Sequence, residues 1–255
     1  VLLRDDIAAD FDDRAGPFKS EGTAHAELAN QLMRAVNRPV IIVPRIYADS
    51  LIDSSDPHSL SYLQDLTTSL SSTSLIVYCG NDIVAQQIGG DASGHIAAGR
   101  LVIWDNFYAN DYCPRRLFIG PWRRAKGTSN VLLNPTGMFE TDKLLLQVMQ
   151  IGDDVDKWRA FLEPHLPTAF FTLAYYFDAP FGFKTKFVPP AAEKALVAVD
   201  HLLWRWKSPL QREWYPVLMG LKQDLLIADQ QMSDVRIAKT QSAALSGALL
   251  VPPDD

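Results

Sequence analysis

Two adjacent carboxylates near the start of the chain are its most evident candidates for acid–base chemistry. Asp5 and Asp6 follow a short apolar run at residues 1–3. Neighbouring carboxylates suit a reaction that needs one ionised and one protonated acid, because repulsion between like charges separates the pKa values of a pair. A helix cap or a turn would also explain two consecutive aspartates. A further alternative is an acidic cation site completed by Asp10, Asp12 and Asp13.

Polar or aromatic residues also follow four later apolar runs. The runs cover residues 40–43, 75–78, 101–104 and 131–133, and their ends carry Tyr47, Cys79, Asp105, Asn106 and Asn134. Each run is short and continuously apolar, which is typical of a strand buried on both faces. Functional groups at the carboxyl ends of successive strands are typical of (β/α)8 barrels and of Rossmann-type sheets. No Gly-x-Gly-x-x-Gly or Walker motif follows any run, so the sequence gives no sign of a nucleotide site.

Helical patterns lie between these runs. Apolar residues recur at helical spacing over residues 23–37 and 57–71. The predicted buried faces of these two helices consist of Ala24, Leu28, Leu32 and Val36, and of Leu60, Leu63, Leu66 and Leu70. Further helices are predicted at residues 83–88, 92–98 and 139–150.

The alternation of strands and helices indicates an α/β fold with a parallel sheet. Five strands are expected when the run at residues 1–3 is counted, whereas a (β/α)8 barrel needs eight. We therefore expect the C-terminal part of a (β/α)8 TIM barrel, about five of its eight strands, with three upstream strands missing. Residues 1–150 form this predicted portion, and residues 151–255 are predicted to form an all-helical domain, with helices near 153–163, 168–177, 190–207 and 209–235.

Composition excludes several classes of protein. The 255 residues are 47% hydrophobic and 21% charged, as expected for a globular protein, and the net charge of -6 argues against nucleic acid or an anionic membrane as partner. No signal peptide and no membrane-spanning run are found, which slightly favours a cytoplasmic location but leaves the compartment open. Two cysteines and scattered histidines show no metal-ligand spacing, so neither a metal nor a cofactor is expected. A basic stretch fits a solvated loop, or a site that binds an anionic polysaccharide or peptide; it consists of Arg115, Arg116, Arg123, Arg124 and Lys126.

A more specific signal lies in the fourth run and the segment after it. Trp104-Asp105-Asn106 is followed by Asn110-Asp111-Tyr112, by a Leu-x-x-Gly-Pro at residues 117–121, and by Asn134-Pro135. This order of motifs closely resembles glycoside hydrolase family 84, the group of O-GlcNAcases and bacterial hyaluronidase-like enzymes. Asp5-Asp6 resembles the aspartate pair that follows the family's fourth barrel strand, and Tyr47 the tyrosine of its Pro-x-x-Tyr.

The chain departs from the family pattern at three places. Tyr78-Cys79-Gly80-Asn81 replaces the usual Trp-Thr-Gly-Pro, Arg4 stands where an apolar residue is commoner, and Arg45-Ile46 replaces the usual Thr-Glu. The family's first three barrel strands also supply a backbone carbonyl and a lysine to the sugar. The three substitutions bear on substrate preference more than on the type of reaction. The absence of the first three strands is the graver departure, because nothing in this chain supplies the carbonyl and the lysine.

The resemblance implies a retaining β-N-acetylglucosaminidase that hydrolyses terminal β-linked GlcNAc, such as O-GlcNAc, by substrate-assisted catalysis through an oxazoline. Residues 1–150 would be the catalytic portion, and the partner would be a GlcNAc-bearing glycoside or glycoprotein. Asp5 matches the carboxylate that orients the acetamide, and Asp6 the general acid and base. Regular strand geometry would aim two neighbours at opposite faces, so both reach one site only where the strand gives way to a loop.

The resemblance also assigns substrate-binding residues. Tyr47 would donate to the acetamide oxygen, Trp104 would wall the acetamide, and Asn106 would bind nearby. Asp111 and Asn134 would bind the distal hydroxyls of the sugar. Cys79 and Ile83 would line the acetamide pocket. Taken singly, each residue is also explained by packing or by a turn.

Two other functions remain open at this point. The chain could be a non-catalytic carbohydrate-binding relative, although binding alone does not require a second acid. It could also be a barrel fragment that needs the missing N-terminal segment, supplied as a separate chain, for activity.

Overall fold

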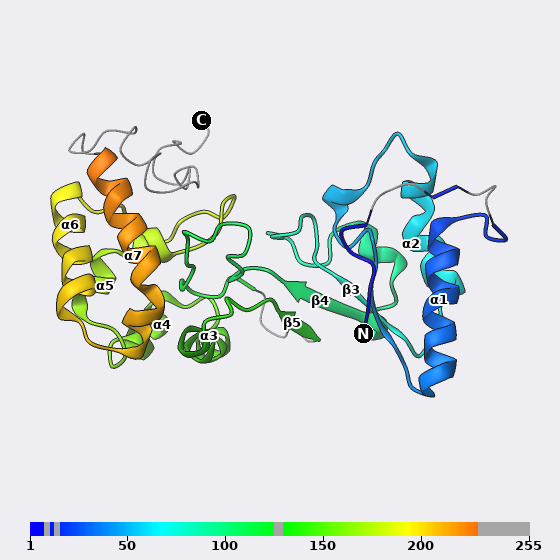
Figure 1. Ribbon diagram of the computed structural model, residues 1–255, viewed down its shortest axis with the longest axis horizontal. Coiled ribbons are helices and arrows are strands. Elements are labelled where there is room, and N and C mark those ends of the chain that lie inside the picture. Colours follow the sequence, from blue (N-terminus) through cyan, green and yellow to red (C-terminus); the bar gives the residue numbers. More distant parts are fainter. Residues whose placement is uncertain (8–10, 13–15, 125–129, 229–255) are drawn as a thin grey trace. The chain divides into compact units, whose positions relative to one another are not determined.

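The computed structural model describes residues 1–7, 11–12, 16–124 and 130–228 (Figure 1). The chain divides into two compact units. The first consists of Val1–Asn106 and Gly127–Asn134, and the second of Phe107–Lys126 and Pro135–Asp255. The contacts group the helix near 139–150 with the second unit, whereas the sequence predicts it in the first domain. The division of function at residue 150 stays a prediction.

A five-stranded parallel sheet forms the first unit. Its strands lie in the order in which they occur in the chain: β1 (Leu2–Leu3), β2 (Ile41–Val43), β3 (Leu75–Tyr78), β4 (Leu101–Asp105) and β5 (Val131–Leu133). The five predicted strands and their parallel pairing are therefore confirmed. A sequential order is that of a β/α barrel, whereas a Rossmann-type sheet reverses its order at a switch point.

Both faces of this sheet are covered by apolar side chains. Ile42 and Ile76 point into a cluster that also holds residues of α1 (Glu21–Val36) and α2 (Pro57–Ser69). Val43 and Val77, one residue further along, point into a second cluster on the opposite face. Such alternation follows from the two-residue period of a strand. The helices therefore cover one face, and the other face leads to the residues that follow the strand ends.

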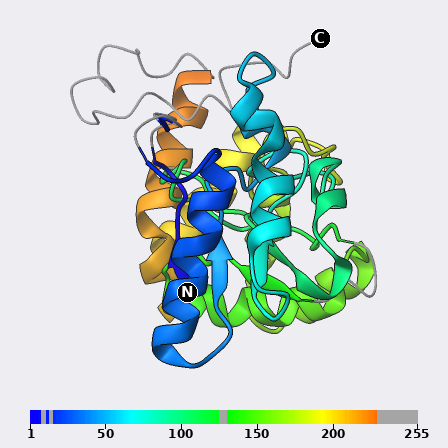
Figure 2. The same cartoon turned by 90° about the vertical axis from the view of Figure 1, so that its right-hand side faces the viewer.

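The predicted apolar face of α1 is wrong. The buried residues of this helix are small or polar, and include Ala26 and Ala29, whereas Leu28 and Val36 are exposed. The reason is close packing of α1 on α2, which lie side by side (Figure 2) and leave no room for larger side chains. The predicted face of α2 is confirmed at Leu63, Leu66 and Leu70, which are buried in the core, and only Leu60 is exposed. Residues at helical spacing mark a helix, but the tertiary contacts decide which face is buried.

Gly22 is the closest point of this helix pair and gives a stability prediction. A Cβ built on Gly22 would lie 2.8 Å from the backbone nitrogen of Leu66 and closer still to the carbonyl oxygen of Tyr62. Gly22→Ala should therefore lower the free energy of unfolding by about 1–3 kcal/mol, the usual cost of overpacking. Chemical denaturation measures this. Gly94→Ala is the matched control, because a Cβ there meets nothing within 4 Å; equal effects of both changes would contradict the packing account.

The helix predicted at residues 83–88 is not formed. The segment after β3 folds back on itself as a loop, with a bridge between Gly80 and Ile88 and a hydrogen bond from the Asn81 nitrogen to the Gln87 oxygen of 3.1 Å. A Cβ on Gly80 would overlap the Gln87 carbonyl, so glycine permits this close return. The prediction at residues 92–98 reduces to a short 3₁₀ helix, Ala92–His95.

The second unit is helical. Its α-helices are α3 (Phe139–Ile151), α4 (Val155–Leu162), α5 (Thr168–Thr172), α6 (Ala192–Asp200) and α7 (Pro209–Ala228). A 3₁₀ helix follows α5 at Ala174–Phe177, and a π-helix continues α6 at His201–Arg205. The predicted helices are thus present in shorter pieces, and residues 229–235 of the last prediction lie outside the described residues.

Buried aromatic rings form the core of this second unit. Trp158 and Trp214 are almost completely buried, and each indole N–H finds a hydrogen-bond acceptor. The acceptor for Trp214 is Thr141 Oγ1, at 2.8 Å. Glu213 accepts hydrogen bonds from backbone nitrogens at the start of α3 and so caps that helix from α7. None of the helices within the described residues is both long and apolar enough to cross a membrane.

Two arginines of the basic stretch, Arg115 and Arg123, contradict both interpretations of the sequence. Arg115 pairs with Asp224, and Arg123 pairs with Asp178; both carboxylates are almost completely buried. A guanidinium that faces a buried carboxylate neither lies in a solvated loop nor offers its charge to a polysaccharide. Lys126 lies outside the described residues.

Candidate functional site

The two aspartates lie on a turn at the end of β1. The Arg4 nitrogen donates to the Val43 oxygen at 2.9 Å, and this is where pairing of β1 with β2 ends. Asp5 and Asp6 then form a turn, and Asp6 has a φ of 53°, in the left-handed region. The turn removes the geometric objection to a shared site, because the two residues no longer follow the alternation of a strand. A left-handed φ in a residue other than glycine costs energy and is found disproportionately at functional sites.

Tyr47 connects this turn to the next strand end. Its hydroxyl lies 3.4 Å from Asp6 Oδ1, and its ring lies 5.6 Å from that of Trp104, centroid to centroid. Burial raises the pKa of Tyr47 to about 12, with further contributions from the charges of Asp6, Cys79 and Asp5. The hydroxyl is therefore protonated at neutral pH and available as a donor.

A second group of predicted residues is joined by hydrogen bonds. The Asn106 side-chain nitrogen donates to the Ile83 carbonyl at 2.7 Å and lies 3.3 Å from Cys79 Sγ. Asn134 donates to Asn106 Oδ1 at 3.0 Å. Asn106 thus holds the loop after β3 against the ends of β4 and β5.

Both groups meet one apolar cluster. Tyr47 and Cys79 are buried in the cluster on the face of the sheet opposite α1 and α2, and Ile83 and Trp104 pack against it. The structure thus brings eight of the nine predicted site residues to the carboxyl ends of the strands in the first unit. Asp111 belongs to the second unit, where it is exposed and its Oδ1 accepts from the Tyr112 nitrogen at 3.1 Å. Its predicted role stays a prediction.

The alternative acidic cation site receives no support from the described residues. Asp10 and Asp13 lie outside them. Within the part of the chain that the structure describes, no three His, Cys, Asp or Glu side chains are grouped so that they could hold a metal ion.

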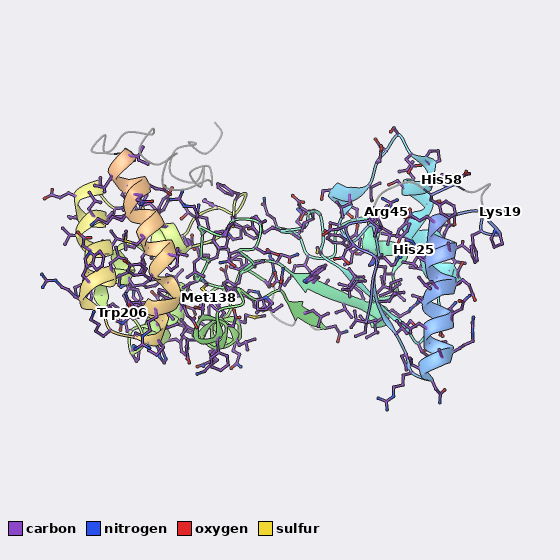
Figure 3. All side chains as sticks on the ribbon, viewed as in Figure 1. Lys19, His25, Arg45, His58, Met138 and Trp206 are labelled. Atoms are coloured by element: carbon purple, nitrogen blue, oxygen red, sulfur yellow. The ribbon has the colours of Figure 1, made fainter. Side chains whose placement is uncertain are left out.

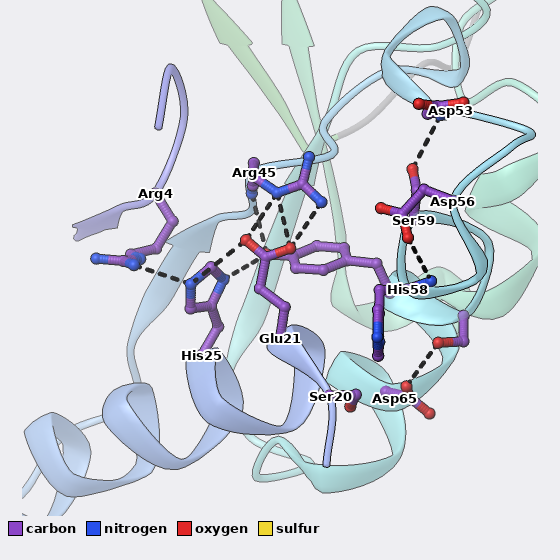
Figure 4. Close-up of polar contacts among 12 residues, drawn as sticks. Arg4, Ser20, Glu21, His25, Arg45, Asp53, Asp56, His58, Ser59 and Asp65 are labelled. Atoms are coloured by element: carbon purple, nitrogen blue, oxygen red, sulfur yellow. Dashed lines mark hydrogen bonds and ion pairs between the residues drawn. The ribbon is translucent and has the colours of Figure 1, made fainter. Parts of the chain in front are cut away.

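A buried polar network that sequence reasoning missed lies behind the turn (Figure 4; His25 and Arg45 are also marked in Figure 3). Arg4 Nη2 lies 2.9 Å from His25 Nε2 on α1, and His25 Nδ1 lies 2.8 Å from the Tyr62 hydroxyl on α2. The Tyr62 hydroxyl also accepts a hydrogen bond from the backbone N–H of Arg45, at 3.0 Å. Arg45 in turn pairs with Glu21, with Nε 2.7 Å and Nη2 2.6 Å from carboxylate oxygens. The only local sign of this network in the sequence is the spacing of Glu21 and His25, which places the two side chains one helical turn apart.

The hydrogen bonds fix the state of His25. A guanidinium can only donate, so Nε2 must carry the lone pair that accepts from Arg4. The proton of a neutral ring then lies on Nδ1, which donates to the Tyr62 oxygen. Consistent with this, burial and the positive charges of Arg4 and Arg45 lower the pKa of His25 to about 4.

This lowered pKa predicts a pH-dependent stability. Because the folded pKa of about 4 lies below the unfolded value of 6.5, the unfolded chain binds the proton first as the pH falls. The stabilisation is complete above pH 6.5 and decreases as the pH falls towards 4. Between pH 7 and pH 5 the loss should be about 2 kcal/mol, measured by urea denaturation. His25→Gln is the control, since glutamine is polar and uncharged and does not titrate; an equal loss in that variant would contradict the assignment.

Comparison with known proteins extends these observations. The profile of a family described as beta-N-acetylglucosaminidase matches residues 1–149, which include all nine predicted site residues. The chain is 28% identical to Protein O-GlcNAcase of Rattus norvegicus over 167 residues, which cover 58% of this chain and 17% of the rat protein. It is 27% identical to Protein O-GlcNAcase of Mus musculus over the same length. The matched segment is therefore a small part of each of these relatives.

A solved structure agrees at the level of the fold. The structure of CpGH84B matches with a TM-score of 0.55 and 14% sequence identity, over 93% of this chain and 50% of that chain. The five-stranded parallel sheet with its helices is thus an arrangement found in a protein of glycoside hydrolase family 84.

Proposed function

The chain belongs to the beta-N-acetylglucosaminidase family, glycoside hydrolase family 84, and on that premise we propose that it is a retaining glycosidase that removes terminal β-linked GlcNAc from O-GlcNAc-type substrates. The predicted family resemblance is confirmed. The observation that carries the proposal is the meeting of Asp6, Tyr47 and Trp104 at the carboxyl ends of β1, β2 and β4, with Asp5 beside Asp6. Pure binding would not require two acids on a strained turn.

The proposed reaction has two steps. In the first, the acetamide oxygen of the substrate attacks the anomeric carbon, the bond to the leaving oxygen breaks, and an oxazoline forms. Asp5 accepts the acetamide N–H and stabilises the developing positive charge, while Asp6 gives its proton to the leaving oxygen. In the second step Asp6 removes a proton from water, which opens the oxazoline at the anomeric carbon. Two inversions give net retention.

The other residues of the first unit would hold the acetamide. Tyr47 is a protonated donor and would exchange its long hydrogen bond with Asp6 for one to the acetamide oxygen. Trp104 supplies an apolar wall beside it. Cys79 and Ile83 lie in the same apolar cluster and suit the acetamide methyl group.

Amide and carboxylate groups would bind the rest of the sugar. The Asn106 side chain is fixed by Ile83 and Asn134, which presets its orientation near the site. Asn134 and Asp111 are proposed as ligands of the distal hydroxyls, and the Asp111 carboxylate would accept charge-assisted hydrogen bonds from them.

The proposal extends to the fold. Within the described residues, β1 pairs with β2 alone and β5 with β4 alone. Closing a barrel of eight strands would need three more between these two edges. We propose that residues 1–150 are the catalytic (β/α)8 portion, completed by an upstream segment in the same or a separate chain, and that residues 151–255 are a helical domain.

A series of substrates tests the substrate-assisted step. The substrates are aryl β-glycosides whose 2-acetamido group carries zero, one, two or three fluorines. Fluorine withdraws electrons from the acetamide oxygen, so kcat/KM should fall steadily along the series if this oxygen is the nucleophile. The corresponding glucoside, which lacks the acetamide, is the control and should not react. Equal rates along the series would contradict participation by the acetamide.

A further inference from the structure

We infer that Arg4 is a positioning residue, which holds the turn of Asp5 and Asp6 in register with the Tyr47 loop through the buried network of His25, Tyr62, Arg45 and Glu21. The inference rests on the proposed function and adds to it a residue that contacts no substrate. Arg4 directly precedes Asp5, and Arg45 lies two residues before Tyr47. One chain of hydrogen bonds therefore ends at each of the two loops that form the site (Figure 4).

The turn needs an anchor beyond its own backbone. β1 is two residues long, and Asp6 is exposed and left-handed. The described hydrogen bond of Asp6 to Tyr47 is long, at 3.4 Å. Catalytic groups must be held within about 0.5 Å of their productive geometry. Such a short strand cannot provide this precision alone, whereas the side chain of Arg4 is fixed to a helix.

The network is suited to this task because it is buried and directional. His25, Glu21 and Tyr62 are at most 6% exposed. Arg4 can only donate and His25 Nε2 accepts, so the hydrogen bond between them has one direction. At the other end, the Arg45 guanidinium is held by both oxygens of Glu21. A helix, α1, thus fixes the side chains that follow β1 and β2 at the same time.

Kinetics of Arg4 variants test the inference. Arg4→Met keeps the length of the side chain but removes its donors, and should lower kcat about 10-fold with little change in KM, since misplaced catalytic groups slow the chemical step. Arg4→Lys restores a donor towards His25 and should recover most of kcat. Arg38→Met is the matched control, because Arg38 is exposed on the same unit, and should leave both constants unchanged.

A second variant, Tyr62→Phe, tests the same network at another residue. Tyr62→Phe removes the oxygen that joins His25 to Arg45. It should lower kcat by a similar factor, and the double variant with Arg4→Met should lose little more than either alone, because both changes break the same connection. Wild-type kcat in Arg4→Met would overturn the inference, and so would losses that multiply in the double variant.

The thermal midpoint separates positioning from folding. A loss of kcat that follows the decrease in Tm, and that Arg4→Lys does not recover, would mean a merely structural role and would also overturn the inference. Failure of the proposed function can be told apart from failure of this inference, because the wild-type protein itself would then lack activity. A wild type that neither hydrolyses aryl β-N-acetylglucosaminides nor binds an oxazoline mimic would remove both.

Discussion

Asp5→Ala is expected to lower kcat/KM at least about 100-fold, the scale typical of a positioned acid or base, for every β-N-acetylglucosaminide tested. Asp5 would orient the acetamide and stabilise the charge that develops on it, and this step precedes departure of every leaving group. The loss should therefore be similar for activated aryl glycosides and for O-GlcNAc peptides. Steady-state assays with both kinds of substrate measure it.

The matched control for this change is Asp156→Ala. Asp156 is an exposed aspartate of α4, and its loss should leave kcat/KM unchanged. Near-normal rates in Asp5→Ala would end the substrate-assisted proposal, because no other described carboxylate lies on the same turn as Asp6.

Asp6→Asn is expected to separate substrates by their leaving groups. A protonated Asp6 would assist departure of an alkoxide such as a serine side chain, which leaves poorly without a proton. Hydrolysis of O-GlcNAc peptides should fall by at least about 100-fold, whereas aryl glycosides with acidic phenols should retain far more activity. Asparagine keeps the size of the side chain and an oxygen that can accept from Tyr47, so the turn should be preserved.

Comparing good and poor leaving groups within the same variant provides the control, because any general loss of folded protein lowers both rates equally. A plot of log kcat/KM against the pKa of the leaving phenol should become steeper in Asp6→Asn than in the wild type. Parallel lines, with equal losses for good and poor leaving groups, would contradict the role of Asp6 as the acid.

Much of the first unit could be predicted from the sequence because its signals are local. Short runs of β-branched residues such as Ile41–Val43 are typical of strands that are buried on both faces of a sheet. The helical patterns between the runs indicate that the strands are parallel. The buried face of α1 could not be predicted, because it depends on how closely Gly22 approaches α2. The loop after β3 was also mistaken for a helix, since its apolar residues are held by a return to Gly80.

In the candidate site, too, local signals could be predicted from the sequence and contacts between distant segments could not. Motif order identified the family and the residues at the strand ends. It could not show the left-handed turn at Asp6, which depends on where β1 ends. It also missed the network of Arg4, since Arg4 and His25 are 21 residues apart and His25 and Tyr62 are 37 apart. Such contacts between distant segments leave no periodic trace in a sequence.

The most direct test of the account is the configuration of the first product. An aryl β-N-acetylglucosaminide would be incubated with the 255-residue chain, and with a version extended by its upstream coding sequence, while proton NMR follows the anomeric signals. The account predicts release of GlcNAc as the β-anomer first, at least by the extended version, followed by slow mutarotation. Initial release of the α-anomer, or no release by either version together with no binding of an oxazoline mimic, would contradict it.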